Sequence, residues 1–180
     1  MASTSMKPIA SLVLVTVIGV LAGCAAPASR ESMAPTTVSV AKNFPYTVAV
    51  ETRGGSETSS TGISNISDAD LKAAIENSIE RSNLFRSIVQ GKGADYELTV
   101  TLVPLVRPLI GFSFTVDMEA GWALVRAVNK SVVMRKSIKS TFTATMGDSM
   151  AGVTRMRLAI EGAARSNVEQ GLQAIAELNL

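Results

Sequence analysis

Two segments of the chain alternate strictly between apolar and polar residues. Residues 94–103 place four large apolar side chains on one face and four polar side chains on the other, and residues 112–125 continue this pattern over a longer stretch. Alternation with a period of two is typical of a strand that has one buried face and one wet face. The chain is therefore expected to form a sheet whose apolar face must be covered by other elements.

Two further segments complete the predicted strands. Residues 44–51 carry alternating apolar side chains before a loop rich in Gly, Ser and Thr, and residues 132–144 follow the long alternating segment after a short polar turn. In this last hairpin, a three-residue loop at 129–131 would pair Met118 with Phe142. Because that pairing keeps the apolar faces matched, we expect it to set the register.

Two segments show helical spacing instead. Ser67 and Asp70 resemble a short capping box, and the apolar residues that follow recur every three or four positions up to about Asn83. The same spacing returns over residues 149–178 and predicts a long C-terminal helix. Gly162 and Gly171 lie within it, where they would either bend the helix or let it approach the sheet closely.

The predicted order is therefore one strand, a helix, three strands and a long helix. This order favours an α/β (α+β) fold, a two-layer sandwich in which a mainly antiparallel sheet of about four strands carries two helices on one face. We expect residues 44–180 to form this single domain. Residues 24–43, rich in Pro, Ser, Thr and Ala, are expected to be a flexible tether.

The start of the chain has the layout of a secretory signal. A short segment with one positive charge, Lys7, precedes an apolar run over residues 9–21 and then small residues. Pro8 and Pro27 bound this run before it reaches the length of about 20 residues that a transmembrane helix needs. Residues 1–23 are therefore predicted to be a signal peptide.

The last residues of this signal, Leu21-Ala22-Gly23-Cys24, resemble the lipobox of bacterial lipoproteins. The resemblance implies cleavage between Gly23 and Cys24, and attachment of a glyceride and of palmitate or similar acyl chains to Cys24. Ala25 stands where an aspartate would favour retention at the inner membrane, so the resemblance implies an outer-membrane lipoprotein facing the periplasm. The alternative is an ordinary signal peptide with an incidental cysteine.

Composition argues against several classes of function. The chain has no histidine and one cysteine, which removes the commonest general base and leaves no cysteine pair for a disulfide or a metal site. Its 17 basic and 15 acidic side chains nearly balance, so nothing indicates a nucleic-acid partner. We therefore expect no enzymatic activity, no cofactor and no metal.

Two sets of residues remain as candidates for a site. Alternate acidic residues on the expected wet face could form a cation site or an acid/base pair, but we favour a solvated sheet face; they are Asp95, Glu97, Asp117 and Glu119. The connection over residues 102–112 is almost wholly apolar, although connections usually lie at the surface. Its candidate partner contacts are Leu105, Val106, Arg107, Leu109 and Ile110. Alternatively, this connection folds over one end of the core or extends the strands.

A second resemblance concerns the domain. Its short motifs are Asn83-Leu84-Phe85, residues 94–98 and residues 121–124, followed by the C-terminal helix. They resemble the ABC-type transport auxiliary lipoproteins and the N-terminal domain of the periplasmic protein of the Tol system. The resemblance implies a non-enzymatic accessory of an envelope or transport complex.

Two hypotheses about function follow. In the first, the domain is an interaction module that docks on an envelope protein or associates with itself. In the second, it binds or carries a lipid or another apolar ligand between the sheet and the long helix. An exposed 104–111 connection over a solid core would favour the first, and an apolar cavity lined by Trp122 would favour the second.

Overall fold

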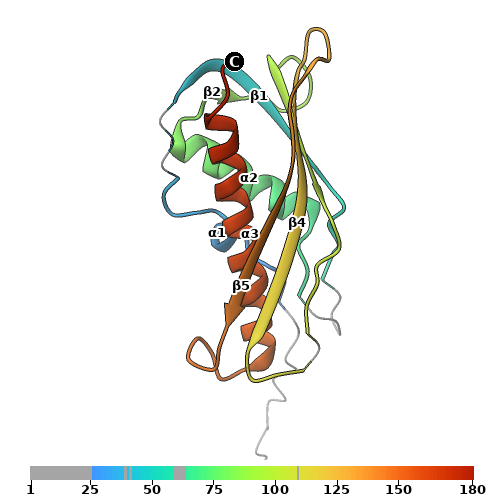
Figure 1. Cartoon of the computed structure of the whole chain (residues 1–180), viewed down its shortest axis with the longest axis vertical. Helices are drawn as coiled ribbons and strands as arrows, with labels where there is room; N and C mark the ends of the chain where they lie inside the picture. The colour runs from blue at the N-terminus through green and yellow to red at the C-terminus, as the bar shows by residue number, and fades with distance from the viewer. Residues whose placement is uncertain (1–25, 39, 41, 59–63, 109) are drawn as a thin grey trace, which may run out of the picture.

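A computed structural model describes residues 26–38, 40, 42–58, 64–108 and 110–180. It shows a twisted five-stranded sheet with its helices packed on one face (Figure 1). The elements in chain order are α1 (Arg30–Met33), β1 (Phe44–Arg53), α2 (Asp68–Ser82), β2 (Phe85–Ile88), β3 (Tyr96–Leu102), β4 (Phe114–Arg126), β5 (Val132–Ala144) and α3 (Gly152–Ala176).

The strand order is β2-β1-β3-β4-β5. β1 runs parallel to both β2 and β3, whereas β3, β4 and β5 are joined by antiparallel pairing. The predicted α+β fold with a long C-terminal helix is thus confirmed, but the sheet has five strands and not four. The additional strand β2 has only four residues, of which Phe85 alone is buried, so it lacks the alternation that identified the others.

Helix α2 begins where the capping box predicted. The backbone N–H of Asp70 donates to Ser67 Oγ at 3.1 Å, and the hydroxyl of Ser67 lies 2.8 Å from Asp70 Oδ2. The helix ends at Ser82, and the capping residue Asn83 adopts the left-handed conformation with φ of 52°. Leu71 and Ile75 point from this helix into the core and are fully buried.

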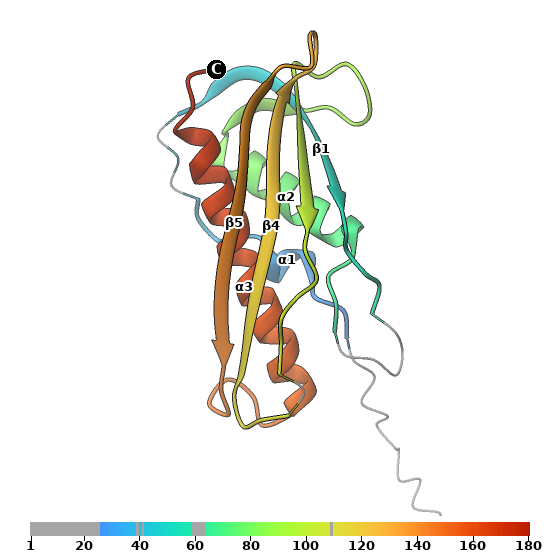
Figure 2. The same ribbon diagram turned by 45° about the vertical axis from the view of Figure 1, so that its right-hand side comes forward.

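Helix α3 lies along the sheet and packs on β4 and β5 (Figure 2). Its two interior glycines face aromatic rings: Gly162 faces Phe142, and Gly171 faces the buried Trp122. A Cβ atom at either glycine would overlap the facing ring. The glycines therefore let a continuous helix approach the sheet closely, which was one of the two outcomes expected for them.

A buried polar network joins α3 to the same two strands. Trp122 Nε1 donates to Asn167 Oδ1 at 3.0 Å, while Asn167 Nδ2 donates to the carbonyl oxygen of Ile138 at 2.9 Å. Ser140 Oγ donates to the carbonyl oxygen of Ala163 at 2.8 Å. Buried polar groups are costly unless they are paired, so this network holds the helix in one position on the sheet.

The register of the β4–β5 hairpin differs from the prediction. Met118 pairs with Ser140, and Trp122 pairs with Lys136, so the strands are displaced by two residues from the expected pairing. A displacement of two preserves which face each side chain occupies, so matching the apolar faces could not distinguish the two registers. An irregularity between Leu124 and Val125 accompanies the observed pairing.

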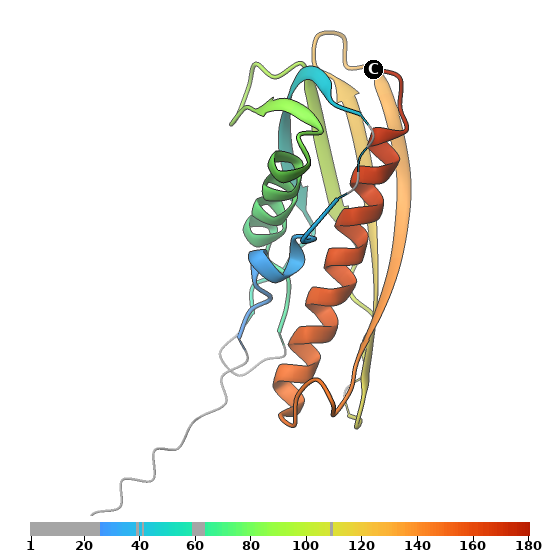
Figure 3. The ribbon, with the colours of Figure 1, turned by 90° about the vertical axis from the view of Figure 1, so that its left-hand side faces the viewer.

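The segment predicted to be a flexible tether is packed on the domain over much of its length. Met33 of α1 is fully buried, and Ala28 and Ala34 are buried beside it. α1 lies between α2 and α3, as Figure 3 shows. The prediction of a tether over residues 24–43 is therefore wrong for residues 28–34, because a short helix and small apolar residues fill the groove between the two longer helices.

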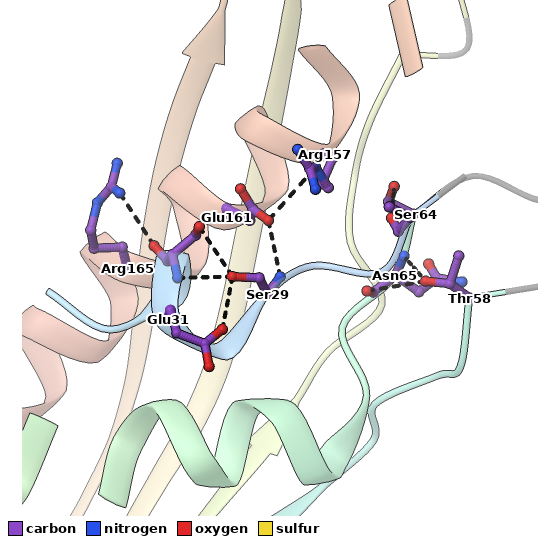
Figure 4. Close-up of polar contacts among 10 residues, drawn as sticks. Ser29, Glu31, Thr58, Ser64, Asn65, Arg157, Glu161 and Arg165 are labelled. Carbon is purple, nitrogen blue, oxygen red and sulfur yellow. Dashed lines mark hydrogen bonds and ion pairs between the residues drawn. The ribbon is translucent and has the colours of Figure 1, made fainter. Parts of the chain in front are cut away.

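Two side chains of α3 bind this N-terminal segment, and a third pairs with one of them (Figure 4). The backbone N–H of Ser29 donates to Glu161 Oε1 at 2.9 Å, and Arg157 Nε lies 3.8 Å from the same oxygen. Arg165 Nη1 donates to the carbonyl oxygen of Ser32 at 3.2 Å. The buried Glu161 carboxylate is thus paired with both a backbone donor and a cation, as a buried charge requires.

Candidate functional site

The sequence-predicted site residues divide into two groups. Gly23, Cys24 and Leu109 lie outside the described residues, so the roles assigned to them stay predictions. The others are the remaining residues of the connection between β3 and β4 and the four acidic residues, which lie in β3 and β4 or directly before β3. Within the described part of the chain, no helix is both long and apolar enough to cross a membrane.

The first half of the β3–β4 connection extends the sheet. The backbone of Val106 exchanges two hydrogen bonds with that of Asp117, at 3.1 and 2.9 Å, and Val103 N donates to the carbonyl oxygen of Glu119 at 2.9 Å. Leu105 packs against the core, whereas the side chain of Val106 is exposed. In this half of the connection, the backbone extends strands β3 and β4, which was one of the alternatives to an exposed contact surface.

Arg107 holds the β3–β4 connection against the loop that precedes α2. Its Nη1 donates to the carbonyl oxygen of Ser64 at 2.6 Å, and Ser64 Oγ donates to the carbonyl oxygen of Ala26 at 2.6 Å. Partial burial lowers the pKa of the Arg107 guanidinium. Through Ser64, this arginine joins the β3–β4 connection to Ala26.

The second half of the connection is held by a residue that sequence reasoning missed. Arg155, on the first turns of α3, is buried; its Nη1 donates at 2.8 Å to the carbonyl oxygens of both Ser149 and Met150, and its Nη2 donates to that of Gly111 at 3.4 Å. Its guanidinium also lies over the ring of Phe114 at 5.5 Å. One buried cation therefore joins the β3–β4 and β5–α3 connections.

The four acidic residues proposed as an alternative site bind local partners. Asp95 Oδ2 accepts hydrogen bonds of 2.8 Å from both the backbone N–H and the hydroxyl of Thr47, and these hold the pKa of Asp95 below its usual value. Glu97 forms an ion pair of 2.6 Å with Lys130. Neither carboxylate is directed toward a shared cation.

The other two carboxylates are engaged in the same way. Asp117 accepts a hydrogen bond of 2.6 Å from the hydroxyl of Thr141. Glu119 accepts one of 2.6 Å from Ser137 and faces Lys139 at 3.5 Å, so hydroxyl and ammonium together lower the pKa of Glu119. No cluster of three potential metal ligands occurs among the residues described. This arrangement is that of a solvated sheet face.

The expected ligand space beside Trp122 is filled. The indole is buried, donates to Asn167 and lies against Gly171 so closely that a methyl group would not fit. A hollow of about 630 Å³ lies elsewhere, near the β4–β5 turn, where Glu97 and Lys130 in its lining already pair with each other. The cavity beside Trp122 that would have favoured the ligand hypothesis is therefore not observed in the part of the chain that the structure describes. The exposed connection that would have favoured docking is observed only in part, since Val106 and Ile110 are exposed but Leu105 packs against the core.

No protein-family model and no curated protein matches this chain. Among solved structures, the fold is similar to that of a Xanthomonas campestris protein of the DUF330 family, at 12% identity and a TM-score of 0.57, covering 78% of this chain and 88% of that one. It is also similar to a Caulobacter crescentus protein described as a candidate lipoprotein, at 17% identity and a TM-score of 0.51, covering 72% and 87%.

A third similar structure is the PelC dodecamer of Paraburkholderia phytofirmans. It is 13% identical, with a TM-score of 0.50, and the match covers 76% of this chain and 92% of that one. At such low identities, these similarities establish a shared fold.

Proposed function

We propose that this chain is a lipid-anchored lipoprotein of the cell envelope whose domain is a non-enzymatic interaction module. The observation that carries the proposal is how close to Cys24 the chain is already bonded to the domain. Ala26, two residues after Cys24 of the Leu-Ala-Gly-Cys motif, is already bonded to the domain through Ser64. An acylated Cys24 would therefore hold the domain directly at the membrane surface.

The chemistry of Cys24 supports the anchor. It is the only cysteine of the chain and so the only residue that can form the thioether to a glyceride. Each buried CH₂ of an acyl chain contributes about 0.8 kcal/mol, and stable anchoring takes more than one chain. Ala25 after this cysteine favours the outer membrane over the inner membrane, with the domain in the periplasm.

Several features support an interaction module over a carrier. The core at Trp122 is filled, and the carboxylates of the open sheet face are partnered within the chain. Of the proposed contact residues, Val106 and Ile110 are exposed. Leu105 instead packs against the core, and Arg107 donates to the backbone of Ser64. The similar PelC structure is a dodecamer, which supports self-association as one form of the interaction. An accessory role in transport rests on the resemblance of the sequence motifs.

The anchor is tested by replacing Cys24. We expect the Cys24→Ala protein to lose its membrane association, because no other group of the chain can carry the lipid. Fractionation of cells, followed by separation of inner and outer membranes on a density gradient, measures the effect. Wild-type protein should sediment with the outer membrane. A Cys24→Ala protein that stayed with the membrane as wild type does would contradict the proposal.

The interaction is tested by crosslinking in the intact envelope, followed by mass spectrometry of the products. We expect wild-type protein to yield one specific product, either with an envelope protein or with a second copy. Val106→Ser should reduce its yield several-fold without altering thermal unfolding, since that side chain is exposed. Val128→Ser, in the β4–β5 turn, is the matched control. Recovery of the monomer alone from the wild-type envelope would count against an interaction module.

A further inference from the structure

One end of the domain carries several large apolar side chains in solvent. Ile110 and Phe112 of the β3–β4 connection are 91% and 82% exposed, and Met150 of the β5–α3 connection is 77% exposed. Val153, in the first turn of α3, is also exposed. Both connections lie at the lower end of the molecule in Figures 1 and 2. We call these four residues the apolar end.

The apolar end is built by the fold. The guanidinium of Arg155 binds the carbonyl oxygens of Met150 and Gly111 at once, so the two connections are held side by side. Asp148, the only acidic residue of the β5–α3 connection, accepts hydrogen bonds from the backbone N–H and hydroxyl of Thr145, at 2.7 and 2.9 Å. Its charge is thereby engaged within its own turn.

The chain enters the domain toward the same end. Ala26 is joined through Ser64 to Arg107, three residues before Ile110. Cys24 precedes Ala26 by two residues, and an extended chain spans at most about 3.6 Å per residue, so the lipidated residue lies within roughly 7 Å of Ala26. A domain anchored so closely cannot stand away from the bilayer.

We propose that the apolar end is seated in the lipid surface beside the anchor. The inference rests on the proposed lipidation of Cys24. Exposed apolar side chains are stabilised when they leave water for the boundary between headgroups and acyl chains, and they add to an acyl anchor. Because Cys24 is only two residues from Ala26, the membrane that holds the lipid anchor lies close to this end of the domain. Seating the apolar end in that membrane directs the β4–β5 turn away from it.

Cysteine labelling of the full-length lipidated protein tests this seating. Because acylation blocks the sole native thiol, Phe112→Cys and Met150→Cys each offer one reactive site for an environment-sensitive fluorophore. Val128→Cys is the matched control, since Val128 is 87% exposed in the β4–β5 turn at the opposite end. Each protein is placed in vesicles of phosphatidylethanolamine and phosphatidylglycerol, after its thermal unfolding is shown to match that of wild type.

We expect lipids that carry a spin label to quench the fluorophores at positions 112 and 150 several-fold more than the one at 128, and aqueous iodide to show the reverse order. Equal iodide quenching at all three positions on bound protein would overturn the seating and leave the anchor intact. Shielding from both quenchers would mean contact with another copy, which also overturns it. Protein absent from the vesicle fraction would refute the anchor and the seating together.

Discussion

Gly171→Ala is expected to destabilise the domain by about 3 kcal/mol, at the upper end of the cost of overpacking a core. The added methyl group would overlap the ring of Trp122, which is buried and held by its hydrogen bond to Asn167. Neither the ring nor the helix can move aside without breaking that bond. Urea unfolding, followed through the fluorescence of this single tryptophan, measures the loss.

Gly121→Ala provides the matched control for this substitution. It adds the same methyl group to β4, but the nearest atom to the new carbon would be the carbonyl oxygen of Thr101 at 3.9 Å, an ordinary contact. We expect its free energy of unfolding to stay within about 1 kcal/mol of wild type. Equal stabilities of the two variants would show that α3 does not pack on Trp122 as described.

Asn167→Ala is expected to cost about 3 kcal/mol of stability, since each buried polar group left without a partner costs about 1–3 kcal/mol. The substitution removes the acceptor of Trp122 Nε1 and the donor to the carbonyl oxygen of Ile138. The free energy of urea unfolding again measures the effect.

The control for this network is Gln170→Ala, on the same helix. The amide of Gln170 is exposed and, among the residues that the structure describes, donates only to Ser166 Oγ at 3.1 Å, so we expect a change within about 0.5 kcal/mol. If the Asn167 variant were as stable as the Gln170 variant, the buried network would not be what positions α3 on the sheet.

The parts of the fold that repeat a simple period were predictable from the sequence. Alternation identified β1, β3 and β4, a less regular apolar pattern after a polar turn identified β5, and the Ser67 capping box identified the start of α2. Strand β2 was not predicted, because it has only four residues and one buried side chain. The register of the β4–β5 hairpin was predicted wrongly, because a displacement of two residues leaves every side chain on the same face. The apolar pattern therefore does not discriminate between the two pairings.

The candidate site was predictable only in part. The apolar composition of the β3–β4 connection indicated an unusual segment but did not decide between exposure and packing; Ile110 is exposed there, whereas Leu105 packs against the core. Arg155 carries no sequence signal, since its role depends on carbonyl groups that come together only in the fold. The N-terminal segment resembled a tether because the Ser29–Glu161 contact joins residues that are far apart in the sequence.

The intact mass and N-terminal residue of the protein extracted from membranes test the central claim most directly. We expect a mature chain that begins at Cys24 and carries a glyceride thioether with its acyl chains on that residue. An unmodified Cys24 thiol, or a mature chain that begins at another residue, would contradict the lipid anchor and with it the orientation of the domain at the membrane.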